Sequence, residues 1–200
     1  MIAKMVCAGS DCFKELYEHD DDEFLVGVDG GALSIIASGY RPQFALGDFD
    51  SGNLAEIASY CDLIKIYPSR KDYGDLELAV MEISKFNPEK IFIYNATGDR
   101  LDHFLATVNV LVKYPKLNIE ILDCRNSIKL LVKDALISKT NYKYLSLFAL
   151  EDETIISLKG FKYNLENYHL ARFDNLCLSN ETDCDGKIST NKKLLLVQTL

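Results

Sequence analysis

The chain has 200 residues, 48% hydrophobic and 26% charged, which is an ordinary composition for a globular protein with ample apolar material for a core. This length suits one large domain or two small ones. The formal net charge of −8 argues against a nucleic-acid-binding protein, because such proteins usually carry a basic surface. A nucleotide substrate is still allowed, since a divalent cation can lie between an acidic site and a polyphosphate. No apolar run reaches 18 residues, so we expect no transmembrane helix and no membrane partner.

The six cysteines lack CxxC spacing, so the sequence supports neither a zinc site nor a redox motif. An even number of cysteines permits disulfides. The N-terminus, however, begins a strand too early to be a secretory signal. We therefore expect a cytoplasmic protein with reduced thiols. The cysteines are Cys7, Cys12, Cys61, Cys124, Cys177 and Cys184.

Up to about residue 125, predicted strands alternate with predicted helices. This alternation predicts an α/β fold, with a mainly parallel, Rossmann-like sheet that helices cover on both faces. We therefore expect an N-terminal α/β domain over residues 1–125. The strands are expected at residues 2–7, 24–28, 44–46, 62–67, 91–94 and 119–122.

Two of the predicted helices carry an apolar stripe at helical spacing, which predicts the face that each buries. Shorter helices are expected at residues 12–18 and after Ala32, where Gly39 ends the helix. The stripes are Leu76, Ala79, Val80 and Ile83 in one helix, and Leu101, Leu105, Val108 and Val112 in the other.

The character of the sequence changes after about residue 125. Short β-rich runs recur there with no helical period between them, which is typical of a small antiparallel β-sandwich or barrel. We place the domain boundary near Arg125, Asn126 and Ser127, so the C-terminal domain spans residues 126–200. The β-rich runs lie at residues 128–132, 142–147, 154–158 and 194–198.

A pair of aspartates follows the predicted strand at residues 44–46, within the segment GDFDS. Residues i and i+2 of an extended chain point the same way, so Asp48 and Asp50 should share one side with Phe49 opposite. Two adjacent carboxylates repel each other unless a proton or a cation lies between them, and Mg²⁺ prefers oxygen ligands of this kind. The alternative is a plain turn, because Gly, Asp and Ser all favour turns.

Further polar clusters also follow predicted strands. In an open α/β sheet the carboxyl ends of the strands line the crevice where ligands bind, so several clusters at one edge are more specific than any one of them. These additional clusters are Asp29 with Gly30 and Gly31, Lys71 and Asp72 with Asp75, and Arg100 with Asp102 and His103.

The glycine and aspartate clusters each have a functional and a structural interpretation. Gly30 and Gly31 either let a phosphate approach the start of a helix or form a simple turn. Asp72 either supports a metal site or caps the next helix, where the helix dipole favours Asp75. A third metal carboxylate is the preferred interpretation of Asp75.

The basic residues also have two interpretations. Lys71 and Arg100 either neutralise phosphate charge or serve as ordinary ion-pair partners. His103 is a candidate general base, although a structural pair with Asp102 is the preferred interpretation.

The whole chain resembles the thiamine pyrophosphokinase family, because five segments stand in the order expected of that family. They are VDGGA at residues 28–32, GDFDS at 47–51, KDYGD at 71–75, TGDRLDH at 97–103 and LSNE at 178–181. The resemblance implies an α/β domain, a β-sandwich domain and a homodimer with active sites at the subunit interface. It also implies that ATP donates a diphosphate to thiamine, with AMP as the second product.

Residue roles follow from the same resemblance. It implies that Asp48, Asp50 and Asp75 hold Mg²⁺, with Asp29 and Asp72 supporting the acidic cluster.

It further implies that Lys71 and Arg100 contact the phosphates of ATP. Asp102 would belong to the catalytic pocket, and Ser179 and Asn180 would face thiamine.

The chain departs from the family pattern at two positions. Gly74 replaces a Thr before the last acidic residue, which removes a hydroxyl near the metal. Leu178 stands where a small residue often precedes Ser-Asn-Glu, which bears on the shape of the thiamine pocket.

In the implied reaction, the substrate hydroxyl attacks the β-phosphorus of ATP, and positioning matters more than deprotonation. If a base takes part, Asp102 or a metal-held carboxylate is preferred to His103. One alternative is a diphosphokinase acting on a hydroxymethyl pterin, although the Ser-Asn-Glu segment favours thiamine. A second is a non-catalytic nucleotide-binding regulatory module, which the dense acidic cluster disfavours.

Overall fold

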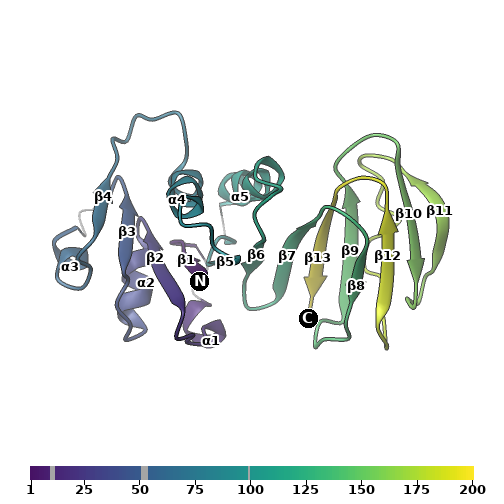
Figure 1. Cartoon of the computed structure of the whole chain (residues 1–200), viewed down its shortest axis with the longest axis horizontal. Coiled ribbons are helices and arrows are strands. Elements are labelled where there is room, and N and C mark those ends of the chain that lie inside the picture. Colours follow the sequence, from purple (N-terminus) through teal and green to yellow (C-terminus); the bar gives the residue numbers. More distant parts are fainter. Residues whose placement is uncertain (10–11, 51–53, 99) are drawn as a thin grey trace. The chain divides into compact units, whose positions relative to one another are not determined.

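The computed structural model describes residues 1–9, 12–50, 54–98 and 100–200. Two positions of the sequence motifs, Ser51 and Asp99, lie outside the described residues. The chain divides into two compact units, Met1–Cys124 and Arg125–Leu200 (Figure 1).

The first unit contains a parallel sheet with the strand order β4-β3-β2-β1-β5-β6. The parallel sheet predicted from the alternation of strands and helices is therefore confirmed. The strands are β1 (Ile2–Val6), β2 (Glu23–Val28), β3 (Phe44–Gly47), β4 (Ile64–Ile66), β5 (Lys90–Tyr94) and β6 (Ile119–Leu122).

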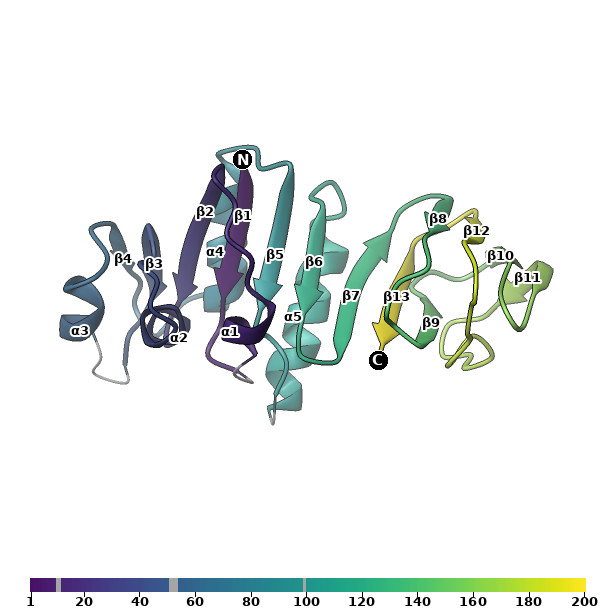
Figure 2. The same cartoon turned by 90° about the horizontal axis from the view of Figure 1, so that it is seen from below.

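Helices cover both faces of this sheet. Figure 2 shows α1 and α2 on one face and α4 and α5 on the other. Phe13 of α1 and Ile35 of α2 pack with Val6 of β1 and Tyr94 of β5 in one buried cluster. The helices are α1 (Phe13–Leu16), α2 (Gly31–Ala37), α3 (Leu54–Ala58), α4 (Asp75–Ser84) and α5 (Leu101–Lys113).

Two of the sequence signals for helices are confirmed. On α4, the stripe residues Ala79, Val80 and Ile83 are buried. After α2, Gly39 has φ +89°, a left-handed conformation that glycine adopts without steric cost and that commonly ends a helix.

The predicted buried stripe of α5 is wrong. Leu101 and Leu105 are 69% and 61% exposed, and the buried residues are instead Thr107, Val110 and Leu111. Apolar residues occur on more than one side of this helix, so their spacing does not reveal which side packs on the sheet. An apolar face of α5 is therefore left open in the single chain.

The second unit is a β-sandwich, as predicted. In one sheet β13 pairs with β7 and β9, and the other has the order β11-β10-β12-β8, with antiparallel pairs throughout. Leu147 and Leu196 from the first sheet share a hydrophobic core with Ile156 and Ile188 from the second. The strands are β7 (Asn126–Leu131), β8 (Ala135–Ile137), β9 (Tyr144–Ala149), β10 (Thr154–Lys159), β11 (Leu165–Leu170), β12 (Gly186–Thr190) and β13 (Leu194–Thr199).

Three strands of the sandwich, β8, β11 and β12, were not expected from the sequence. β11 (LENYHL) is mostly polar and exposed, and β8 has only three residues. Neither shows the alternation of apolar and polar residues that identifies a half-buried strand.

Among the helices that the structure describes, none is long and apolar enough to cross a membrane.

Gly31, the first residue of α2, packs directly against β1. A Cβ at this position would lie 1.9 Å from the carbonyl oxygen of Val6. We expect Gly31→Ala to lower the free energy of unfolding by about 1–3 kcal/mol, the usual cost of overpacking, as measured by denaturant titration. Gly74→Ser is the matched control, because a Cβ there meets no atom within 4 Å and Ser is a favourable residue at a helix N-cap. Equal stability of the two variants would contradict this packing role.

Candidate active site

The order of the strands reverses at β1, which has β2 on one side and β5 on the other. The chain runs outward from β1 through β2, β3 and β4, and then crosses back so that β5 pairs with the other side of β1. Open α/β sheets bind ligands where the strand order reverses in this way. The segments that follow β2, β3, β4 and β5 carry the four polar clusters, so all of them lie at this edge of the sheet, as expected.

Asp29 is the first residue after β2 and has φ +49°, in the left-handed region that Asp tolerates better than most residues. Its backbone N–H donates to the carbonyl of Leu46 in β3 at 2.7 Å, which holds it beside the neighbouring strand. A Cβ on Gly47 would lie 3.0 Å from the Cβ of Asp29. The glycine of the GDFDS segment therefore lets Asp29 come close to the two aspartates that follow it.

Asp48 and Asp50 are brought together by a turn rather than by an extended strand. β3 ends at Gly47, and Phe49 has φ +50°, which is uncommon for a bulky residue and marks local strain. Phe49 is buried against α3 residues such as Ile57, and this burial offsets the cost of the conformation. The expected outcome, with Phe49 inward and both carboxylates outward, is thus reached by a different backbone geometry.

Asp29, Asp48 and Asp50 form a cluster in which one carboxylate oxygen of each lies within 4.8 Å of the others. Oδ1 of Asp29 is buried and has no hydrogen-bond partner among the described residues. Burial raises the pKa of Asp29, and the nearby charges of Asp48 and Asp75 raise it further. A buried, unpartnered carboxylate oxygen beside two more carboxylates fits the hard oxygen ligands that Mg²⁺ prefers.

Lys71 balances part of this negative charge. Its Nζ lies 3.2 Å from Oδ2 of Asp48 and 2.8 Å from Oδ1 of Asp75. The hydrogen bond from Lys71 lowers the pKa of Asp48, whose carboxylate therefore stays ionised. Asp75 is the first residue of α4 and is linked to the cluster through this lysine.

Asp72 is exposed and does not cap α4. The N-cap is Gly74, and no side chain provides a capping hydrogen bond there. The capping interpretation of Asp72 is therefore wrong. Gly31 has a structural reason to be glycine, namely its approach to β1, while Gly30 is less crowded, with a Cβ position 3.2 Å from the Cβ of Ala8.

Arg100 and Asp102 pair with each other at the start of α5. The guanidinium makes a two-point contact, with Nη2 donating to Oδ2 at 2.6 Å and Nε to Oδ1 at 3.3 Å. This pair is exposed, and Arg100 lowers the pKa of Asp102. His103 is also exposed, and its carbonyl accepts a hydrogen bond from Thr107. The structure brings none of these three side chains into the aspartate cluster among the contacts of the described residues.

In the second unit, Asn180 is a buried anchor for the loop before β12. It is 4% exposed, and its Oδ1 accepts from the backbone N–H groups of Tyr163 and Glu181 while Nδ2 donates to the carbonyl of Tyr163. Its backbone also pairs with Leu145 of β9. Ser179, by contrast, is exposed. Asn180 therefore holds this loop in place from within, and Ser179 lies on its exposed side.

An apolar cavity of about 270 Å³ lies beside this loop. Apolar side chains make up most of its wall, and Asn180 supplies a polar edge. The lining residues are Leu158, Tyr163, Leu165, Leu176, Cys177, Leu178 and Asn180.

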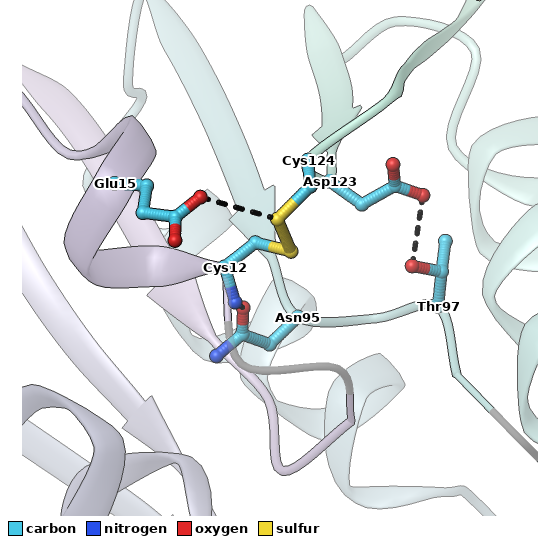
Figure 3. Close-up of a disulfide and its surroundings, with 6 residues drawn as sticks. All are labelled: Cys12, Glu15, Asn95, Thr97, Asp123 and Cys124. Carbon is cyan, nitrogen blue, oxygen red and sulfur yellow. Dashed lines mark hydrogen bonds between the residues drawn. A yellow bond between two sulfur atoms is a disulfide. The ribbon is translucent and has the colours of Figure 1, made fainter.

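The expectation that all cysteines are reduced is wrong for two of them. Cys12 and Cys124 form a disulfide, with their Cα atoms 5.4 Å apart and a sequence separation of 112 (Figure 3). The sheet order explains the pairing, because Cys12 follows β1, Cys124 follows β6, and only β5 lies between these strands. No spacing rule reveals such a pair before the sheet order is known.

Asn95 is a residue of this edge that the sequence did not single out. It follows β5, is 1% exposed and has φ +56°. Its Oδ1 accepts a hydrogen bond from the backbone N–H of Cys12 at 2.9 Å. An Asn directly after a strand, before a Gly-containing loop, is the signal that would have pointed to it.

Comparisons with known proteins match both units of the chain. The family model described as thiamin pyrophosphokinase, catalytic domain, matches residues 14–122, and that described as thiamin pyrophosphokinase, vitamin B1 binding domain, matches residues 134–195. A thiamine pyrophosphokinase from Bacillus subtilis (strain 168) is 35% identical over 187 residues, covering 89% of this chain and 87% of the relative.

Solved structures give the same result. Those of a thiamine pyrophosphokinase from Bacillus subtilis and a thiamin pyrophosphokinase from Geobacillus thermodenitrificans are each 30% identical to this chain, with a TM-score of 0.87. Each match covers 100% of this chain, with 99% and 98% of the two relatives respectively.

The raised pKa of Asp29 predicts that its charge destabilises the protein in the absence of a cation. A folded-state pKa above the unfolded value means that stability falls as pH rises from the unfolded pKa through the folded one. We expect Asp29→Asn to remove that fall and to raise the melting temperature at neutral pH without magnesium. Magnesium should raise the melting temperature of the unaltered protein and have little effect on the variant.

Thermal melts across pH, with magnesium and with a chelator, measure both effects. Asp152→Asn, at an exposed turn of the second unit, is the matched control and should respond as the unaltered protein does. A magnesium response that survives in Asp29→Asn would remove Asp29 from the cation site.

Proposed function

This chain belongs to the thiamin pyrophosphokinase family, and we propose that Asp29, Asp48 and Asp50 lie at the centre of its active site. The enzyme transfers a diphosphate group from ATP to the hydroxyethyl oxygen of thiamine, giving thiamine diphosphate and AMP. The observation that supports the site is the cluster of three carboxylates at the carboxyl edge of the sheet, with a buried oxygen of Asp29 left without a hydrogen bond.

Mg²⁺ is the proposed cation, held by Asp48, Asp50 and Asp75 with Asp29 and Asp72 supporting the cluster. When bound, it would offset the negative charge that develops on the phosphate oxygens during transfer. Asp75 now pairs with Lys71, which also contacts Asp48. ATP phosphates compete for this lysine, so substrate binding would make both carboxylates available to a cation.

The chain's own residues hold the reacting groups in line. Lys71, Arg100 and the backbone at Gly30 and Gly31 are proposed to bind the phosphates of ATP. Arg offers a planar fork that matches phosphate oxygens, and Arg100 already makes a two-point contact of this kind with a carboxylate.

Asp102 is proposed to leave this pairing and to face the thiamine hydroxyl. Phosphoryl transfer is usually loose, so alignment of the hydroxyl with the β-phosphorus matters more than a strong base.

The apolar cavity of the second unit supports a role in thiamine binding. Its walls suit an aromatic ring system, and the exposed hydroxyl of Ser179 lies in the adjoining loop. Asn180 is proposed to contribute by holding this loop in place as well as by lining the cavity. We therefore assign ATP and magnesium to the α/β unit and thiamine to the sandwich unit.

A homodimer with shared active sites is proposed for this enzyme. Leu101 and Leu105 leave an apolar face open on α5, at the start of which Arg100 and Asp102 lie. In the sandwich unit, Phe173 is 90% exposed and Leu176 is 56% exposed. Exposed apolar groups of this size are typical of surfaces that a partner covers.

The two alternative functions, a diphosphokinase acting on a hydroxymethyl pterin and a non-catalytic nucleotide-binding regulatory module, are not favoured. Both family models that match are those of thiamin pyrophosphokinases, and one of them is the vitamin B1 binding domain. A cytoplasmic location remains our proposal. It is supported by the four free cysteines, Cys7, Cys61, Cys177 and Cys184, because secreted proteins of this size usually pair their cysteines.

The decisive experiment is to incubate the protein with ATP, magnesium and thiamine and to measure AMP and thiamine diphosphate. We expect Asp48→Asn to lower kcat/KM by at least about 100-fold, the scale seen when one electrostatic contact to a transition state is lost. Its circular dichroism and melting curve should stay those of a folded protein. Asp152→Asn again serves as the control and should keep full activity. AMP production by Asp48→Asn at the control rate would contradict the proposed site.

Mixed dimers test whether each active site is shared between two chains. Leu178 lines the thiamine cavity and is 55% exposed, so Leu178→Arg should fold normally while its cation repels the cationic substrate. If one chain supplies the aspartates and the other the cavity, a mixed dimer of an Asp48→Asn chain and a Leu178→Arg chain has one site in which both parts are unaltered. Co-expressed chains should therefore form mixed dimers with about half of the activity of the unaltered enzyme. Purified mixed dimers as inactive as their parents would show that one chain supplies both parts.

A further inference from the structure

The Cys12–Cys124 disulfide joins segments that follow β1 and β6, on either side of the segment that follows β5. It therefore lies at the edge of the sheet where the strand order reverses, which is the edge assigned to ATP. Figure 3 shows Asn95, from the segment after β5, directly beside Cys12.

Asn95 connects the disulfide to the loop that leads into the TGDRLDH segment at the start of α5. Its Oδ1 accepts from the N–H of Cys12, and its backbone carbonyl accepts from the N–H of Gly9, both at 2.9 Å. Gly9 has no room for a side chain, because a Cβ there would lie 2.2 Å from the carbonyl oxygen of Asn95 and 2.3 Å from that of Thr97. The segment after β1 and the segment after β5 are thus packed backbone against backbone.

A second contact ties the segment after β5 to the cysteine-bearing end of β6. The hydroxyl of Thr97 donates to Oδ2 of Asp123, the residue before Cys124, at 2.9 Å. The disulfide closes this arrangement covalently from the other side (Figure 3). The segments after β1, β5 and β6 are therefore held together at one point, at the edge of the sheet proposed for ATP.

The environment of the two sulfurs suits a reversible bond. Cys12 is buried, whereas Cys124 is only partly buried and can be reached by a small reagent. Oε2 of Glu15 lies 3.6 Å from Sγ of Cys124, so the thiol of the reduced protein would find a hydrogen-bond acceptor in place. The protein therefore offers a hydrogen-bond acceptor to the Cys124 thiol in the reduced state, and it holds the two cysteines close enough to bond in the oxidised state.

We propose that Cys12 and Cys124 form a reversible thiol–disulfide switch that controls how firmly the segments after β1 and β5 are held for ATP binding. The oxidant is a disulfide of a low-molecular-weight thiol or of a dithiol oxidoreductase. The thiolate of one cysteine attacks this disulfide and releases one thiol, and the second cysteine then displaces the other thiol as the Cys12–Cys124 bond forms. The protein pair loses two electrons and two protons, and the oxidant is reduced to two thiols.

The inference rests on the proposed ATP site, and it assigns the higher ATP affinity to the oxidised state. In that state the covalent bond holds Gly9 and Cys12 in their contacts with Asn95. ATP binding therefore costs less conformational entropy in the oxidised protein. Reduction removes the covalent tie and leaves only the hydrogen bonds.

The test compares oxidised and reduced protein, and the unaltered chain with Cys124→Ser. Reduction should raise the KM for ATP by at least about threefold and change kcat by less than about twofold, because binding order rather than chemistry is affected. Oxidant should restore the KM of the unaltered protein and leave Cys124→Ser in the reduced-like state. Cys184→Ser is the matched control, since Cys184 is exposed and free, and it should keep the full response.

Two measurements need no turnover and so separate this inference from the proposed function. Thiol titration of the unfolded chain should find four thiols after oxidation and six after reduction. Amide hydrogen exchange at Gly9 and Cys12 should become about tenfold faster on reduction. Without the disulfide, less free energy is needed to break the hydrogen bonds that these two N–H groups donate to Asn95. A pair that stays reduced in the presence of the oxidant, or equal exchange and equal KM in both states, would overturn the switch. Absence of AMP production in every state would contradict the function instead.

Discussion

The repulsion among the carboxylates at the ends of β2 and β3 is the constraint on which the rest of this site depends. Asp29, Asp48 and Asp50 bring oxygen atoms within 4.8 Å of one another, and folding must hold them there against their charges. Lys71 offsets part of the repulsion by contacting Asp48 and Asp75. Burial raises the pKa of Asp29, the charges of Asp48 and Asp75 raise it further, and its buried Oδ1 has no hydrogen-bond partner among the described residues. A bound divalent cation would offset this repulsion, so the proposed site would have a higher free energy without the cation than with it.

The backbone around the cluster shows how the fold holds these charges in place. Asp29 and Phe49 both adopt left-handed conformations, which cost free energy in residues other than glycine. The burial of Phe49 beside Ile57 and the hydrogen bond from Asp29 to Leu46 supply the compensating interactions. Strain at the edge proposed for ligand binding is thus balanced by packing and by a backbone hydrogen bond. β2 ends at Val28 and β3 ends at Gly47, so both of these left-handed residues lie just beyond the strands.

The sequence predicted the parts of the structure that depend on local pattern. The parallel sheet, the sandwich and the position of four polar clusters at one edge follow from the alternation of strands and helices and from what stands after each strand. What it did not predict depends on contacts between distant segments or on the exact residue at which an element begins or ends. The Cys12–Cys124 pair requires the strand order, and the N-cap of α4 at Gly74, in place of Asp72, requires the exact start of the helix. The turn at Phe49 was missed for a related reason, since alternation assumes an extended chain and β3 ends two residues earlier.

The apolar face of α5 that includes Leu101 and Leu105 is exposed in the single chain, although its spacing predicted burial. Leu101 and Leu105 have the spacing of a buried stripe, and the helix is amphipathic in the way that this pattern indicates, yet both are exposed. Helical spacing reports that a face is apolar and does not say which molecule covers it. Arg100 and Asp102 stand at the start of the same helix and pair with each other away from the aspartate cluster. Burying the open face of α5 against a second chain would also remove water from around this ion pair, which makes the pair costly to break unless another group takes over each charge. Assembly of a dimer would then hold Arg100 and Asp102 together, and the phosphates of ATP would have to outcompete a desolvated carboxylate for Arg100.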